Sequence, residues 1–170
     1  MIPLESLTST GLVPGGQPLL RRATPDDVPG ITLLVNIHAR RGDLLPRSQE
    51  AIRETLNDWL VVVDGEGVLA CGSLLPYTPE LAEVRSLAVH DRGKRQGLGT
   101  SLVQGLFELA RERQVPTLFT LTRAVPFFKG LGFQVTDKEH YPQKVWKDCN
   151  ICPLQSHCDE TAMELEVLPD

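Results

Sequence analysis

Apolar and polar positions alternate along this chain with two periods, one of about two residues, typical of strands, and one of about 3.6 residues, typical of helices. Short β-rich runs predict strands, which we place at 19–23, 59–63, 68–75, 81–89, 116–122, 133–135 and 162–168. Helical spacing predicts helices over about 24–38, from Ser48 onward, after residue 97 and over 126–130. The elements therefore follow the order β-α-α-β-β-β-α-β-α-β-β, which indicates an α/β protein.

Length and charge narrow the class. The 170 residues suit one domain, which we place at 18–170 after a flexible tail at 1–17. The net charge of −5 gives no reason to expect nucleic acid as a partner. No apolar run is long enough to span a membrane, and no signal peptide is evident, so we expect a cytoplasmic protein. The oligomeric state is not predicted, and a homodimer is one possibility.

A glycine-containing loop joins the strand at 81–89 to the helix that follows it. Gly97 and Gly99 let backbone amides approach a ligand, and the start of a helix favours negative charge. Arg92, Lys94 and Arg95 add positive charge. The loop therefore predicts a phosphate or pyrophosphate site, although glycines at a helix start also serve purely structural roles.

Two blocks of this sequence carry a family resemblance. Val89-His90-Asp91 followed by Lys94–Gly99 resembles the acyl-CoA-binding motif of the GNAT superfamily of N-acetyltransferases, with Lys94 where Arg or Gln is usual. Phe127–Phe133 is similar to its second block, an aromatic residue followed by Gly-Phe. The resemblance implies a single-domain mixed β-sheet with helices on both faces and acetyl-CoA as co-substrate. The implied cofactor-binding residues are Leu87, Ala88, Val89, Lys94, Arg95, Gln96, Gly97, Leu98, Gly99 and Thr100.

Acetyl transfer to an amine needs a proton acceptor and donors for the developing oxyanion. Several members of the superfamily carry a carboxylate on the strand that corresponds to 81–89, which makes Glu83 the candidate general base. Strand alternation puts Glu83 and Arg85 on one face, opposite Val84. The alternative is that the two form an ordinary surface pair. The oxyanion donor would be a backbone N–H within Leu87–Val89.

The general acid stays unassigned. Many relatives carry a tyrosine five residues before the phenylalanine of the Gly-Phe pair, but this chain has Phe128, which has no proton to give. The thiolate can leave unassisted because a thiol pKa is about 8.5. Tyr77 and Tyr141 are the two tyrosines of the chain, and the sequence places neither at the sulfur.

The acceptor is suggested by a narrower resemblance that covers roughly Leu20–Phe133. Leu44–Ser48, Glu83–Val89 and Leu121-Thr122 resemble the N-acetylglutamate synthase type of amino-acid acetyltransferase. This implies a small-molecule amine acceptor, glutamate first, and a role in arginine biosynthesis. Planar guanidinium groups suit carboxylates, so we expect Arg47 and Arg85 to bind the acceptor, while Arg123 is better explained as a solvated surface residue.

Two alternatives remain at this point. One is a protein or polyamine acetyltransferase, and the other is a non-catalytic acyl-CoA-binding regulator with a metal or redox switch. The second draws on the segment at 140–160, where Cys149, Cys152 and Cys158 have a spacing that only partly fits a zinc site. We favour thiols without metal there, and we expect Cys71 to lie in the core.

Overall fold

The computed structural model describes residues 17–140 and 160–167. The strands are β1 Leu19–Arg22, β2 Trp59–Asp64, β3 Gly67–Thr78, β4 Leu81–Val89, β5 Thr117–Thr122, β6 Gln134–Val135 and β7 Thr161–Glu166. The α-helices are α1 Val28–Arg40, α2 Gln49–Glu54, α3 Leu98–Glu112 and α4 Val125–Gly130. Their order is the predicted one. Residues 1–16, most of the predicted tail, lie outside the described residues.

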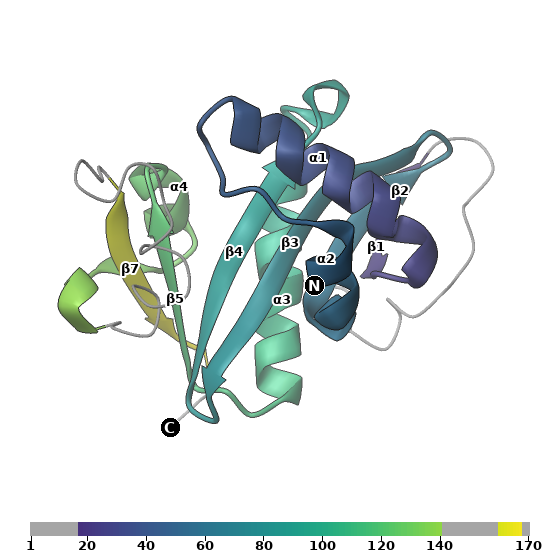
Figure 1. Ribbon diagram of the computed structural model, residues 1–170. Coiled ribbons are helices and arrows are strands. Elements are labelled where there is room, and N and C mark those ends of the chain that lie inside the picture. Colours follow the sequence, from purple (N-terminus) through teal and green to yellow (C-terminus); the bar gives the residue numbers. More distant parts are fainter. Residues whose placement is uncertain (1–16, 141–159, 168–170) are drawn as a thin grey trace.

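One seven-stranded sheet with the order β1-β2-β3-β4-β5-β7-β6 organises the described chain. β4 and β5 pair in parallel, whereas the other neighbouring strands pair antiparallel. Figure 1 shows α1 and α2 on one side of the sheet and α3 on the other. The predicted mixed sheet with helices on both faces is therefore confirmed.

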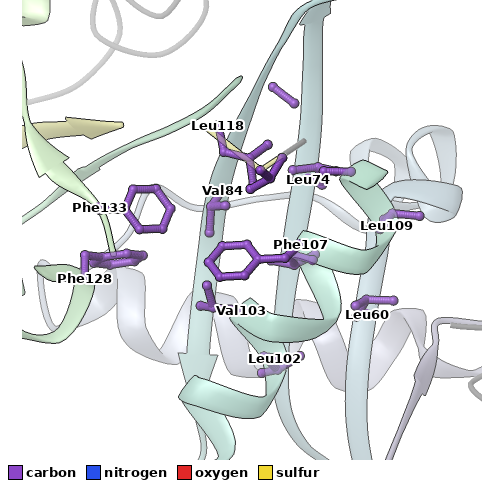
Figure 2. Packing of buried hydrophobic residues seen from close by; sticks show 14 of the residues in the cluster. Leu60, Leu74, Val84, Leu102, Val103, Phe107, Leu109, Leu118, Phe128 and Phe133 are labelled. Carbon is purple, nitrogen blue, oxygen red and sulfur yellow. The ribbon is translucent and has the colours of Figure 1, made fainter. Parts of the chain in front are cut away.

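The α3 face of the sheet holds the larger core. The apolar stripe predicted for this helix is buried, and it packs on residues from β2, β3, β4 and β5 (Figure 2). The stripe consists of Leu98, Leu102, Leu106, Leu109 and Ala110. α3 also approaches the sheet closely, because a Cβ at Gly105 would lie 2.9 Å from a methyl carbon of Leu60.

A second core lies under α1. Its members come from α1, α2, β2, β3 and β4, and they include the fully buried Cys71, as the sequence predicted. Burial raises the pKa of the Cys71 thiol to about 12, so this thiol stays protonated and packs as a small apolar side chain.

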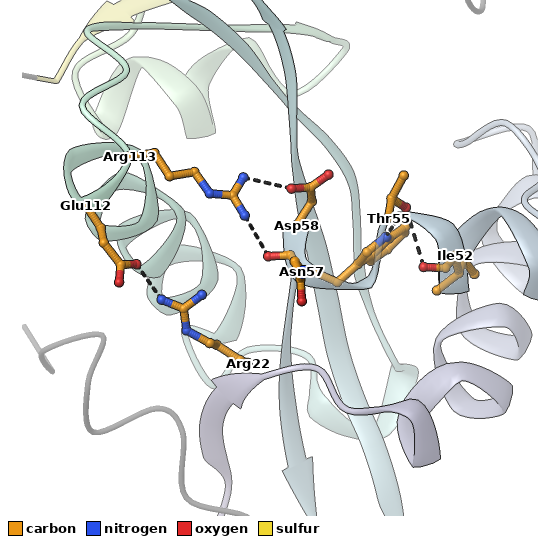
Figure 3. A network of polar contacts seen from close by, with 8 residues as sticks. Arg22, Ile52, Thr55, Asn57, Asp58, Glu112 and Arg113 are labelled. Carbon is orange, nitrogen blue, oxygen red and sulfur yellow. Dashed lines mark hydrogen bonds and ion pairs between the residues drawn. The ribbon is translucent and has the colours of Figure 1, made fainter. Parts of the chain in front are cut away.

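Polar contacts hold the C-terminal end of α3 against the end of β1 and the residues just before β2 (Figure 3). Arg113 donates to the Asp58 carboxylate and to the Asn57 carbonyl, each at 2.7 Å. Glu112 forms an ion pair with Arg22, the last residue of β1. These contacts hold the C-terminal end of α3. Its N-terminal end, with the glycine loop before it, follows β4.

A buried ion pair closes the junction between β1 and α1. Arg21 contacts both carboxylate oxygens of Asp27, at 2.6 and 3.0 Å, and each side chain is 8% exposed. Burial alone would raise the pKa of Asp27, but hydrogen bonds from Arg21 and Thr24 outweigh it and lower this pKa. The pair therefore stays ionised at neutral pH.

Candidate active site

β4 and β5 are paired over only part of their length. The parallel ladder joins Leu81–Glu83 to Thr117–Phe119, while β4 continues to Val89 and β5 to Thr122. Just beyond Glu83, the hydroxyl of Thr120 donates to the Val84 carbonyl at 2.9 Å. Figure 1 shows the two strands diverging from this point toward their C-terminal ends. The sheet thus opens beside the second half of β4.

A β-bulge interrupts the second half of β4. The pairs Ser73–Arg85 and Cys71–Ala88 leave one extra residue on β4, and Ser86 there adopts the left-handed region with φ +57°. The bulge changes which face each side chain occupies. Val84 before it and Leu87 after it both pack on the α3 side, although they are three residues apart.

Glu83 lies next to the position where the strands part. It faces away from α3, and the whole residue is 1% exposed. The Tyr77 hydroxyl donates to Glu83 Oε1 at 2.8 Å. Tyr77 itself is left out of the ladder, between the pairs Pro76–Ala82 and Thr78–Leu81. A second bulge, on β3, therefore accompanies the contact with the carboxylate.

The predicted acceptor-binding arginines lie on two different elements. Arg85 follows Glu83 by two residues on β4 and is half-buried. Arg47 is half-buried in the loop between α1 and α2, where the Asn36 side chain on α1 bonds its backbone twice. Asn36 Nδ2 donates to the Arg47 carbonyl at 2.9 Å, and the Arg47 N–H donates to Asn36 Oδ1 at 3.2 Å. Asn36 thus fixes the backbone from which the Arg47 side chain extends.

The loop that carries Arg47 is also tied to the far side of the opening. Leu44 in this loop packs on the core under α1. Arg123, which follows β5, donates to the Gly42 carbonyl at 3.0 Å. This exposed arginine therefore connects the start of the loop to the end of β5, which is a structural role that the sequence did not predict.

Gly97 caps α3, a helix of 15 residues, and its backbone is left-handed with φ +73°. A Cβ at Gly97 would lie within 4 Å of no atom of the described residues. Arg95, two residues earlier, is also left-handed with φ +67°. The loop thus leaves open space at the N-terminus of a long helix, which fits an anionic group such as a pyrophosphate.

The charges around this loop are more balanced than the sequence suggests. Arg92 forms ion pairs with Asp64 and Glu66 on the β2–β3 hairpin, and Lys94 pairs with Asp91 at 3.0 Å. Asp91 also contacts both Nη atoms of Arg41, at 3.1 and 2.8 Å. Hydrogen bonds from Arg41 and Lys94 hold the pKa of Asp91 well below its usual range. Much of the positive charge predicted for the loop is therefore neutralised within the protein.

Phe128 on α4 is part of the core. It is 4% exposed and makes edge-to-face contacts with Phe127 and Phe133, at centroid distances of 5.0 and 5.2 Å. Its position thus supplies packing and no proton. Tyr141, like the cysteine-containing segment from 141 to 159, lies outside the described residues.

Two kinds of feature are absent from the described part of the chain. Residues 17–140 and 160–167 contain no group of three or more histidine, cysteine or carboxylate side chains placed to hold a metal ion. No helix in these ranges is both long and apolar enough to cross a membrane.

The sequence did not predict three features: the contact of Tyr77 with Glu83, the two hydrogen bonds between Asn36 and the Arg47 backbone, and the bulge at Ser86. Only one of these has a sequence signal. Tyr77 lies four residues before Leu81 across the short connection Pro79-Glu80, so a hairpin there would bring it close to the start of β4. The other two depend on pairing and loop positions that local sequence does not encode.

The fold and the open loop at the start of α3 fit an acyl-CoA-dependent acyltransferase, and the comparisons with known proteins give the family. The model of the acetyltransferase (GNAT) family matches residues 34–133. The chain belongs to this family. It is an N-acetyltransferase with acetyl-CoA as its co-substrate.

Relatives by sequence include a protein of similar length and longer ones. The chain is 36% identical to the Uncharacterized N-acetyltransferase CT2212 of Chlorobaculum tepidum, over 89% of this chain and 97% of that protein. It is 31% identical to an amino-acid acetyltransferase of Mannheimia succiniciproducens, over 74% of this chain. That match spans only 29% of the Mannheimia protein.

Solved structures give the same fold. Rv2747 from Mycobacterium tuberculosis, in complex with CoA and NLQ, superposes with a TM-score of 0.75 at 25% identity, over 88% of this chain and 99% of that chain. N-acetylglutamate synthase from Neisseria gonorrhoeae, complexed with coenzyme A and N-acetyl-glutamate, gives a TM-score of 0.79 at 21% identity, over 90% of this chain and 36% of that chain.

Proposed function

We propose that this enzyme acetylates the α-amine of a small acidic amino acid, glutamate first, and glutamine or aspartate next. The observation that carries the proposal is the buried Glu83 carboxylate with Arg85 two residues along the same strand, beside the position where β4 and β5 part. The resemblance to amino-acid acetyltransferases supports the same class of acceptor. A role in arginine biosynthesis would follow from this acceptor.

Glu83 is the proposed general base. An amino acid at neutral pH carries an ammonium group, which has to lose a proton before the nitrogen can attack. A carboxylate on β4 at the opening of the sheet can accept that proton, directly or through a water molecule. When bound, acetyl-CoA supplies the thioester carbonyl that the free amine attacks.

Arg85 and Arg47 are the proposed carboxylate-binding residues. Arg85 extends from the strand and face that carry Glu83, so a carboxylate held there would present its neighbouring amine toward the base. Arg47, positioned by Asn36, can take the second carboxylate of glutamate. Two cations near the acceptor would disfavour the charged amines of polyamines and lysine-rich peptides.

The proposed acetyl-CoA site is the segment Lys94–Thr100 with Leu87–Val89 of β4. Backbone amides at the start of α3 would hold the pyrophosphate, which makes the site depend on backbone shape more than on side-chain charge. Because Lys94 already pairs with Asp91, its contribution to phosphate binding would be smaller than its charge suggests.

Glu83→Gln tests the base, because it keeps the shape of the side chain and removes the proton acceptor. Turnover should fall by about a hundredfold or more, with CoA affinity unchanged. Glu80→Gln is the matched control, since Glu80 is an exposed carboxylate three residues away. Near-native turnover in Glu83→Gln, with an unchanged acid limb of the pH–rate profile, would place the base elsewhere.

A substrate panel tests the acceptor. Twenty amino acids, spermidine and a histone-tail peptide are assayed for CoA release, and activity should be highest with glutamate. Arg85→Ala should raise the KM for the acceptor by about 10- to 150-fold, which is the loss of about 1.5–3 kcal/mol for a charged hydrogen bond. Arg53→Ala, an exposed arginine on α2, is the control. Activity confined to spermidine or the peptide would refute this acceptor.

A further inference from the structure

We infer that Tyr77 is a positioning residue for the reaction, which holds the Glu83 carboxylate in the orientation that proton transfer requires. This inference rests on the proposed role of Glu83 as general base. Tyr77 would act through that base and not on the departing thiolate. Its hydroxyl lies 2.8 Å from Glu83 Oε1, which is hydrogen-bonding distance.

The surroundings of the Glu83 carboxylate are buried. Glu83 is 1% exposed, so solvent contributes little to holding it. Phe119 lies opposite it on β5 and Leu75 lies opposite it on β3, and neither has a polar side-chain atom. A carboxylate is planar, so a hydrogen bond that holds Oε1 restricts the directions in which Oε2 can point. Proton transfer works only within about 2.6–3.2 Å, which makes that direction decisive.

Tyr77 is itself held on two sides. Its ring packs on the fully buried Phe119 with a centroid distance of 5.5 Å and an interplanar angle of 46°. Its backbone lies at the bulge between Pro76 and Thr78, and bulges recur beside active sites, where they redirect a side chain. The hydroxyl therefore reaches Glu83 from a fixed ring.

Tyr77 and Glu83 differ in how far they are buried. Tyr77 is half-buried as a whole residue, while Glu83 is buried. The phenol contacts Glu83 on the side of the sheet that carries Arg85.

Tyr77→Phe tests the inference, because it removes the hydroxyl and keeps the ring on Phe119. We expect kcat to fall about tenfold, which is the loss expected for a weak charged hydrogen bond, while the KM for the acceptor stays unchanged. CoA affinity, measured by calorimetry, should stay unchanged and shows that the fold is intact. Thr120→Val is the matched control, since it removes another hydroxyl beside the parting strands, one that donates to the Val84 carbonyl and not to the Glu83 carboxylate.

A double-mutant cycle with Glu83→Gln separates this inference from the proposed function. If Tyr77 acts through Glu83, Tyr77→Phe should have no further effect on kcat in the Glu83→Gln background. Multiplied effects in the double variant, or native kcat in Tyr77→Phe, would overturn the inference while Glu83 stays the base. Native turnover in Glu83→Gln alone would instead place the general base elsewhere, and would overturn the role of Tyr77 with it, while the acceptor assignment is tested separately by the substrate panel.

Discussion

Gly97→Val should weaken acetyl-CoA binding through a direct clash with the ligand. Gly97 is left-handed, with φ +73°, and a side chain there would extend into space that the described residues do not fill. The added side chain would therefore meet the ligand and no described residue beyond its chain neighbours. Displacing one charged hydrogen bond to a backbone N–H costs about 1.5–3 kcal/mol, which is about a 10- to 150-fold rise in the Kd for CoA.

The variant should also lose some stability, and a control separates the two effects. A left-handed backbone costs a residue with a side chain about 1–2 kcal/mol, which lowers the Tm of a chain of this size by about 2–8 °C. Gly42 is the matched control, because it has φ +82° and equally open space around its Cβ, but it lies at the end of α1. Gly42→Val should lower the Tm similarly and leave the Kd for CoA unchanged. Equal Kd values for CoA in Gly97→Val and the native protein, measured by calorimetry, would refute the placement of the pyrophosphate.

Two further predictions concern stability and acceptor binding. Because the pKa of Asp27 is lowered in the folded state, its contribution to the free energy of unfolding is present above about pH 4 and is lost as the pH falls through the folded pKa. Asp27→Asn should therefore be less stable than the native protein at pH 7 and should lose less on acidification, as denaturant titrations at several pH values would reveal. Asn36→Ala should raise the KM for the acceptor and leave the Kd for CoA unchanged, because it releases the backbone of Arg47. Steady-state kinetics check this, and an unchanged KM would contradict the role of Arg47.

The elements with strong local patterns can be predicted from the sequence. The predicted bounds of β4 are the observed ones, and the stripe from Leu98 to Ala110 on α3 is buried as expected. Burial patterns of this kind depend on local alternation, which the sequence encodes directly. β3 is an exception, because it continues to Thr78, beyond the predicted end at Leu75.

The extension of β3 has a physical reason. A proline such as Pro76 removes a backbone donor, and the sequence therefore indicates the end of the strand. In the structure β2 pairs with β3 only as far as Ser73, so Pro76 lies where β3 has a single neighbour, β4. The missing donor costs little there, and the strand continues to the bulge at Tyr77.

The candidate site is only partly predictable, because its geometry depends on the two bulges that flank Glu83 and Arg85. A regular β4 would place Val84, Ser86 and Ala88 on the same face. The bulge at Ser86 instead returns Leu87 to the α3 side and sends Ala88 to the core under α1. The same strand therefore supplies core residues at both ends and charged residues between them. Register shifts of this kind come from pairing with β3, so strand periodicity alone could identify Glu83 and Arg85 but not the contacts around them.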